Sequence, residues 1–346
     1  MRKILFLSAT VLILIIGYIS IGNYFKEKDC FSKPKKMAIQ ALKNMVNPNG
    51  SIQYEWDYQI PYTSDKKNNV RLMGTAYSLA YALYVEQDKS LIPVIQNVFN
   101  HYSNKIKRPT IKTGAKALLL LAVIYYEQAT NDNKFSQLRD TLLQQLKRLY
   151  QPQIGFKIRR DTTKTSPYFD GESWLALATY NHFYPKDKGV IDLLKKIDTD
   201  MLEKYDPTVF DKSFFHWGMQ SAATRFKDTN DKKFLDYMKK MMQAYLEYGH
   251  ISTSSAACAY LEGLTTAAAA VQTADKEFYF LLQNYATAHL QSIINLQVLD
   301  TLPMTNTPVP DEVSQFKGAF LLNKNSSKTR CDATQHCIVA LLKYKS

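Results

Sequence analysis

The amino-acid sequence predicts an all-α protein, an (α/α)6 toroid in which an inner ring of helices lies inside an outer ring. Some of the predicted helices are apolar on every side, whereas the helices between them carry one apolar stripe. A helix that is apolar all round has to be enclosed by protein, and a striped helix covers it with its polar face toward water. This alternation, together with the number of helices, predicts the two rings.

Six inner helices are expected to start near residues 71, 112, 170, 213, 255 and 332. Four of them contain the all-apolar stretches Ala117–Tyr126, Trp174–Ala178 within Glu172–Tyr180, Gly263–Val271 and Ile338–Leu342. Six outer helices are expected over residues 33–46, 90–104, 134–149, 188–204, 231–247 and 276–298. Their single stripe is clearest in Phe135, Leu138, Leu142, Leu146 and Leu149, which follow one another at helical spacing.

Successive inner helices start roughly 42 residues apart, a period that also suits open solenoids of helical hairpins. Two longer intervals indicate insertions over residues 151–167 and 299–329, and the second is long enough to cover the opening of the ring as a lid. Short strand-like pieces begin at Gly50, Gly155 and Gly318 and are expected to form rim loops or hairpins. The apolarity of the inner set and the lack of a repeated residue signature favour the closed toroid over the solenoid.

The chain divides into an N-terminal segment, residues 1–29, and one toroid domain, residues 30–346. Arg2 and Lys3 precede an uncharged run from Ile4 to Ile21 that is long enough to span a bilayer and lacks a clear cleavage site. We therefore expect a signal anchor with the domain outside the cytoplasm, in the periplasm or on the cell surface. A cleaved signal peptide, which would leave a secreted protein, is the alternative.

The net charge of +13 favours an anionic partner, such as an acidic polysaccharide or a membrane surface, although lysines scattered over outer helices are also an ordinary solvated face. No nucleic-acid-binding motif accompanies the charge. The histidine, cysteine and carboxylate spacings resemble no metal site, so neither a metal nor a cofactor is expected. Cys331 and Cys337 lie too far apart along one helix to pair, which leaves bridges between different elements or buried free thiols.

Chemistry is expected where the inner helices begin, because parallel inner helices bring their N-termini and dipoles to one end of the ring. The six predicted starts carry charged, aromatic and imidazole side chains. They are Arg71; Lys112; Tyr168, Asp170 and Glu172; His216 and Trp217; Tyr260 and Glu262; and Arg330, Asp332, Gln335 and His336. Their convergence is the functional-site hypothesis of the sequence.

The third and sixth inner helices lie opposite each other in a six-membered ring. Asp170 and Glu172 on one side would then face Asp332 on the other, as the acid and base of glycoside hydrolysis must. Each residue also has a structural explanation: Asp170 and Asp332 suit helix N-caps, and Glu172 suits a capping box. His216 and Trp217 suit a packed pair, whereas Glu262 precedes an apolar run in which an unpaired carboxylate would be costly.

Three segments resemble bacterial six-hairpin toroid proteins related to carbohydrate-active enzymes. They are the stretch from Tyr168 through Gly171-Glu172 to Leu177, the start His216-Trp217-Gly-Met-Gln220, and the run from Arg330 to His336. The resemblance implies the toroid fold and a polysaccharide or oligosaccharide ligand. Its members include glycoside hydrolases, unsaturated-uronyl hydrolases, epimerases and lyases, so it leaves the reaction open.

The favoured hypothesis is a glycosidase-like enzyme in which Asp170 or Glu172 donates a proton and Asp332 activates water. Substrate binding is assigned to Arg71, Tyr168, His216, Trp217, Glu262, Arg330, Gln335 and His336. In a lyase or uronate epimerase, His216 or His336 would instead remove a proton from the sugar while Arg71 or Arg330 neutralises its carboxylate. A glycan-binding or scaffolding component of the cell envelope, without catalysis, is the third possibility.

Overall fold

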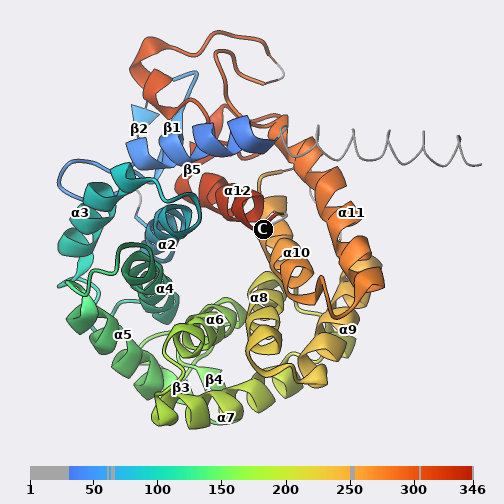
Figure 1. The fold of residues 1–346 in the computed structure, drawn as a ribbon. Helices are drawn as coiled ribbons and strands as arrows, with labels where there is room; N and C mark the ends of the chain where they lie inside the picture. Colours follow the sequence, from blue (N-terminus) through green and yellow to red (C-terminus); the bar gives the residue numbers. More distant parts are fainter. Residues whose placement is uncertain (1–30, 61, 64–66, 250–253, 304, 345–346) are drawn as a thin grey trace, which may run out of the picture.

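The computed structural model describes residues 31–60, 62–63, 67–249, 254–303 and 305–344. Within these ranges, six helices form an inner ring and six form an outer ring (Figure 1). The inner helices are α2 (Asn69–Glu86), α4 (Thr113–Thr130), α6 (Pro167–Phe183), α8 (Lys212–Thr229), α10 (Ala257–Val271) and α12 (Cys331–Lys343). The outer helices are the one over residues 31–44, α3 (Ile92–Tyr102), α5 (Ser136–Leu149), α7 (Lys188–Lys204), α9 (Lys232–Tyr248) and α11 (Lys276–Ile294).

The ring is closed, because each inner helix packs against the next one and α12 packs back against α2. This contact excludes the open solenoid. In α4, nearly every side chain from Thr113 to Tyr126 is buried, whereas in α5 burial is restricted to the stripe from Leu138 to Leu149. The prediction of inner and outer helices from these two patterns is confirmed.

The ends of the helices follow from local side-chain chemistry. Asn68, Asp187, Asp211, Asp231 and Asp275 cap α2, α7, α8, α9 and α11 by accepting a hydrogen bond from a backbone N–H of the first turn. At the other end, Gln87, Asn131 and Asn230 stop α2, α4 and α8 in the left-handed backbone conformation. Three of the six inner helices therefore end at a residue in this conformation.

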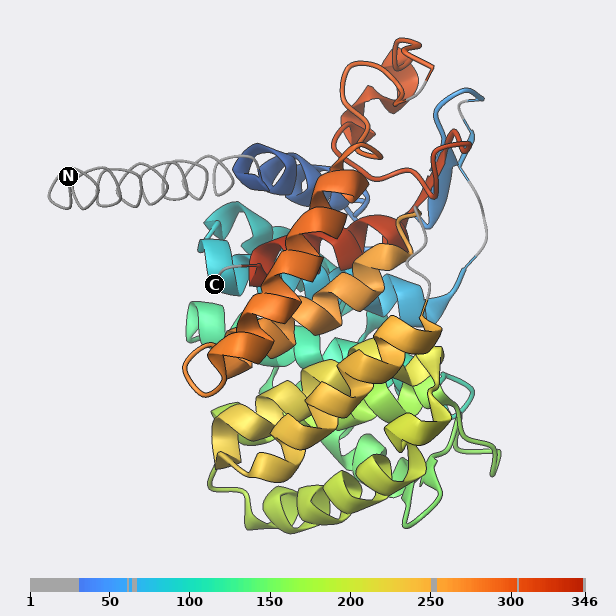
Figure 2. The same ribbon diagram turned by 90° about the vertical axis from the view of Figure 1, so that its right-hand side faces the viewer.

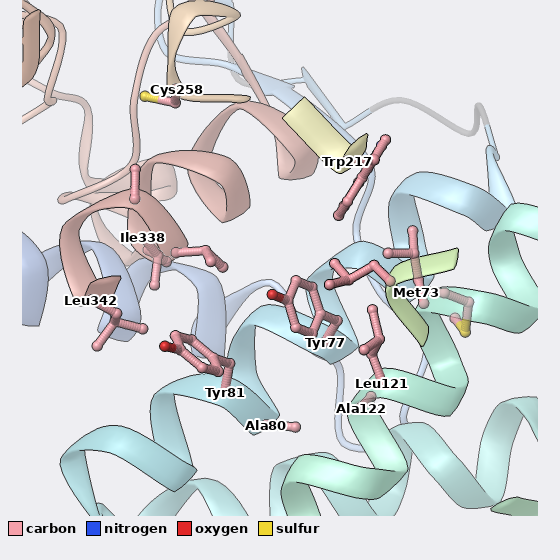
Figure 3. Packing of buried hydrophobic residues seen from close by; sticks show 14 of the residues in the cluster. Met73, Tyr77, Ala80, Tyr81, Leu121, Ala122, Trp217, Cys258, Ile338 and Leu342 are labelled. Atoms are coloured by element: carbon pink, nitrogen blue, oxygen red, sulfur yellow. The ribbon is translucent and has the colours of Figure 1, made fainter. Parts of the chain in front are cut away.

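The interior of the ring is a packed core. Figure 3 shows Met73, Tyr77 and Tyr81 of α2 with Leu121 of α4 and Ile338 of α12 among the buried side chains. A disulfide between Cys258 and Cys337 joins the neighbouring helices α10 and α12, and the thiol of Cys331 is free and buried. Cys30 lies outside the described residues.

Two small antiparallel sheets supplement the helices. Strands β2 (Tyr62–Thr63), β1 (Glu55–Asp57) and β5 (Lys328–Arg330) form one sheet in that order, with Glu55 opposite Arg330. Strands β3 (Tyr150–Gln151) and β4 (Gly155–Phe156) form a hairpin. Three 3₁₀ helices, η1 (Lys89–Leu91), η2 (Pro207–Val209) and η3 (Asp311–Phe316), complete the described elements.

The insertion over residues 299–329 does not form the predicted lid. Its helix η3 packs outside the inner ring, where Phe316 stacks on Trp56 with ring centroids 4.3 Å apart. Asn44 of the helix over residues 31–44 donates a hydrogen bond to the carbonyl of Gln315. Figures 1 and 2 show this orange-red segment beside that helix and beyond the ring. Most apolar side chains of the insertion are buried, and among its described residues only Leu322 and Asn323 line the central pocket.

No helix in the described part of the chain is long and apolar enough to cross a membrane. The predicted span from Ile4 to Ile21 lies outside the described residues.

Candidate active site

A cavity of about 580 Å³ opens at the end of the ring where the inner helices begin, and all six contribute to its wall or rim. Seven of the predicted site residues line it: Arg71, Tyr168, Glu172, His216, Arg330, Asp332 and His336. Its volume is within the range of small-molecule sites in proteins. The gathering of these side chains follows from the parallel inner helices.

Glu172, in the first turns of α6, forms part of the cavity wall and is almost completely buried. Its Oε2 atom has no hydrogen-bond partner among the described residues. Burial raises the pKa of Glu172 well above its ordinary value, because a carboxylate loses its hydration there without gaining a counter-charge. Gly114 of α4 makes room for this side chain, since a Cβ at position 114 would lie 1.8 Å from Oε2. The surroundings of Glu172 therefore favour the protonated carboxylic acid over the carboxylate.

Asp332, across the ring on α12, is held by two arginines. Arg330 donates from Nε and Nη2 to the two carboxylate oxygens at 2.6 and 2.8 Å, and Arg71 Nε lies 2.9 Å from Oδ2. Arg71 also donates to the hydroxyl of Tyr54. Asp332 is not a helix cap, because α12 begins at Cys331 without a side-chain cap. Both of its oxygens are therefore already engaged by guanidinium groups.

His336 and His216 lie next to each other in the wall, with ring centroids 5.6 Å apart. His336 Nδ1 is 2.8 Å from Oε2 of Glu262, a fully buried residue of α10. His216 Nε2 is buried and has no hydrogen-bond partner among the described residues. Burial, followed by the nearby charge of His336, lowers the pKa of His216 well below its ordinary value, so this imidazole stays neutral.

Three other predicted binding residues lie behind the cavity wall. Glu262 reaches the cavity only through His336, as described above. Trp217 is buried and packs against the imidazoles of His216 and His336, with centroid distances of 4.4 and 6.0 Å. Gln335 accepts a hydrogen bond from Thr75 Oγ1 at 3.1 Å and thereby joins α12 to α2. Trp217 and Gln335 support the site and do not line it.

Asp170 does not line the cavity, so the structure does not bring it together with Glu172 and Asp332. It is completely buried on the outward side of α6, where the N–H of Phe156 and the hydroxyl of Tyr205 each donate at 2.6 Å. Lys204 Nζ adds an ion pair at 2.7 Å. Asp170 is not an N-cap either, because α6 starts three residues earlier, at Pro167. Its carboxylate instead ties α6 to the hairpin β3–β4 and to the end of α7.

Sequence reasoning missed Lys212, Asn68 and Asn323, which also line the cavity. Lys212 is the first residue of α8, so its position at an inner-helix start was a usable signal. Together with Lys112, Arg71 and Arg330 it gives the cavity four cationic side chains. Among the described residues, the carboxyls in the lining are Asp332 and Glu172, whose pKa burial raises, and the six helix N-termini add positive potential. The cavity is therefore electropositive.

No family model matches this chain, and no curated protein matches its sequence. Solved structures nevertheless share its fold over most of their length. The GH76A α-1,6-mannanase from Salegentibacter sp. HEL1_6 superposes with a TM-score of 0.72 at 13% identity, covering 91% of this chain and 98% of the mannanase. An unsaturated glucuronyl hydrolase specific for heparin gives a TM-score of 0.65 at 14% identity, covering 91% of this chain and 97% of the hydrolase. The unsaturated glucuronyl hydrolase from Bacillus sp. GL1 gives a TM-score of 0.66 at 10% identity, covering 91% of this chain and 97% of that hydrolase. The resemblance to six-hairpin toroid proteins is thus confirmed, and the chain has the (α/α)6 fold of these carbohydrate-active enzymes.

Proposed function

We propose that the chain is a glycoside hydrolase-like enzyme that cleaves an anionic oligosaccharide or polysaccharide, with Glu172 as the proton donor. The observation that carries this proposal is the buried Glu172 in the cavity wall, whose Oε2 lacks a partner among the described residues and whose pKa burial raises. A protonated carboxyl of this kind can pass its proton to the glycosidic oxygen as the bond breaks. The unpartnered Nε2 of His216 offers a second polar contact that a sugar hydroxyl would satisfy.

The shape and chemistry of the cavity suit a saccharide. Tyr168 at the rim is 48% exposed, and Tyr260 and Phe169 also line the cavity, so aromatic faces are available for stacking on a sugar ring. Guanidinium, ammonium and imidazole groups surround them and can bind hydroxyl groups. One solved neighbour was crystallised with α-1,6-mannotetrose after two adjacent aspartates were replaced to inactivate it. This chain contains no Asp-Asp dipeptide, so that adjacent pair is not present in it.

The charge of the cavity favours an acidic sugar over a neutral one. Arg71 and Arg330 are 35% and 28% exposed at their side chains, and their remaining N–H groups are accessible to a bound carboxylate or sulfate. Lys112 and Lys212 extend the positive rim. Binding should therefore weaken with added salt, whereas salt-independent binding of a neutral glycan would limit the charge to a surface property.

A test is to incubate the purified protein with two probes chosen from the solved neighbours, α-1,6-mannotetraose and an unsaturated glucuronyl disaccharide from heparin. We expect release of new reducing ends from the acidic probe, and about a 10²-fold or larger loss of turnover in Glu172→Gln. Binding without turnover would identify a glycan-binding component instead. Turnover that is unaffected in Glu172→Gln would remove Glu172 from the mechanism.

A lyase or uronate epimerase is the second candidate, because the imidazole of His336 lies in the same cavity as the two arginines that could neutralise a uronate carboxylate. The products separate the two reactions. A lyase leaves an unsaturated, ultraviolet-absorbing sugar, an epimerase leaves the chain length unchanged, and a hydrolase adds one water to each bond that it cleaves.

We further propose that the run from Ile4 to Ile21 anchors the enzyme in a membrane with the toroid outside the cytoplasm. Its uncharged length supports this placement. The full-length protein should then remain with the membrane fraction after a high-salt wash. A soluble chain beginning between residues 20 and 32 would show that the segment is a cleaved signal peptide.

A further inference from the structure

The two ring nitrogens of His336 have different surroundings. Nδ1 is 2.8 Å from the carboxylate of Glu262, which is fully buried, whereas Nε2 has no hydrogen-bond partner among the described residues. His336 is 19% exposed and forms part of the cavity wall. Because Nδ1 points to the buried glutamate, the accessible edge of the ring is the one that carries Nε2.

Glu262 selects the tautomer of this imidazole. A carboxylate has only acceptor atoms, so its contact with Nδ1 requires the proton of the neutral ring to be on Nδ1. The lone pair then lies on Nε2, toward the cavity. The same arrangement of carboxylate and imidazole prepares the general base in hydrolytic triads, where the carboxylate orients the ring and stabilises the imidazolium that forms.

Glu262 also acts electrostatically on two other buried groups, Lys343 and Tyr77. Burial lowers the pKa of Lys343 to about 8, and the charge of Glu262 acts against this by favouring the protonated lysine. Burial and then the charge of Glu262 raise the pKa of Tyr77 well above its ordinary value. Glu262 therefore contacts His336 and also acts electrostatically on Lys343.

The other candidates for a proton acceptor are less suitable. Both oxygens of Asp332 already accept from Arg330 and Arg71. His216 has no carboxylate partner among the described residues, and a pKa well below the ordinary range makes it a weak base. Burial favours the protonated form of Glu172, which suits a proton donor better than an acceptor. His336 is the acceptor that remains in this part of the cavity.

We propose that His336 Nε2 is the proton acceptor of the reaction and that Glu262 is the residue that positions it. This inference rests on the proposed hydrolytic function. A water molecule transfers one proton to Nε2 while its oxygen bonds to the anomeric carbon. The glycosidic bond breaks, and its oxygen takes the proton of Glu172. One water is consumed; His336 then releases its extra proton to solvent, and Glu172 takes up a proton from solvent.

The first test needs no substrate. Long-range ¹H–¹⁵N spectra of the full-length protein labelled with ¹⁵N-histidine report which ring nitrogen carries the proton, and the signal that disappears in His336→Gln is that of His336. We expect the proton on Nδ1 at pH 8, and its transfer to Nε2 in Glu262→Leu, where nothing accepts from Nδ1. A proton on Nε2 in the unmodified protein would overturn the proposal. An unchanged tautomer in a folded Glu262→Leu variant would do so too.

The second test uses whichever of the two saccharide probes the unmodified protein cleaves. Glu262→Gln keeps the shape and removes the charge, and should lower kcat about 10²-fold while KM changes by only a few fold. Glu127→Gln is the matched control, because Glu127 is also a buried glutamate, paired with Arg139 at 2.6 Å and absent from the cavity lining. It should lower Tm and leave kcat unchanged. A folded Glu262→Gln with kcat within threefold of the original would refute the positioning role. If neither probe is cleaved, the hydrolytic function fails while the tautomer result still decides the role of Glu262.

Discussion

Replacing Glu172 by glutamine should make the stability of the protein less dependent on pH. Burial raises the pKa of Glu172 well above 4.5, so above pH 4.5 the folded chain retains a proton that the unfolded chain has lost. The free energy of unfolding of the original protein then falls with rising pH by about 1.4 kcal/mol per unit, until the pKa of the folded state is reached. The amide of the Glu172→Gln variant does not titrate, so the variant lacks this loss. The stability of the variant relative to the original should therefore rise between pH 5 and pH 7, by up to about 1.4 kcal/mol per pH unit.

Urea denaturation of both proteins at pH 5, 6 and 7 measures this difference. The buried carboxyls of Asp170 and Asp198, whose pKa values burial also raises, are present in both proteins and cancel in the comparison. A difference that stays constant from pH 5 to pH 7 would show that Glu172 titrates normally. It would remove the physical basis for the assignment as proton donor, because an ordinary glutamate is ionised at neutral pH.

Three further predictions concern the surroundings of the site. Asp170→Asn should lower the free energy of unfolding by about 3 kcal/mol, because it breaks a buried ion pair, while kcat of the folded variant is retained; a lower kcat at unchanged stability would return Asp170 to the mechanism. Serine substitution of Cys258 and Cys337 should cost about 4 kcal/mol in urea denaturation, since the bridge spans 79 residues, and equal stability would show that the bridge is dispensable. Gly114→Ala should reduce kcat at least tenfold by displacing the proposed acid, whereas the control Gly189→Ala, whose Cβ meets its nearest atom at 3.4 Å, should not; equal kcat values would contradict the steric argument.

The alternation of the rings could be predicted because burial on all sides and burial on one side leave different residue patterns. The outer helix predicted over 188–204 agrees with α7 at both ends, and the inner starts near 71, 112 and 213 lie within two residues of the observed ones. The insertion over residues 299–329 could not be placed in the same way. Its apolar side chains indicated that the insertion packs against the rest of the protein. The surface that it contacts, around Trp56, lies far away in the sequence and could not be identified from it.

The site was harder to predict than the ring. Residues at the start of an inner helix reach one end of the toroid. Asp170 and Glu172 are nevertheless only two positions apart, and Glu172 lines the cavity whereas Asp170 contacts the β3–β4 hairpin and the end of α7. A helix that is buried all round gives no sequence signal for which side faces the axis. The partners of Asp170, Lys204 and Tyr205, come from the end of the next outer helix. The apolar sequence after Glu262 signalled an unusual carboxylate, but its pairing with His336 depends on how α10 and α12 are aligned.

Closure of the ring has a consequence for how the protein is made. Thr75 of α2 and Gln335 of α12 are hydrogen-bonded across 260 residues of sequence, and β1 pairs with β5 next to them. The ribosome therefore has to release nearly the whole chain before these contacts can form. Until then the first helices expose apolar surface that α12 later covers, which makes the nascent chain prone to aggregation and its final step slow. Because the cavity includes residues of both α2 and α12, a chain truncated before Cys331 should lack the site as well as the closed fold.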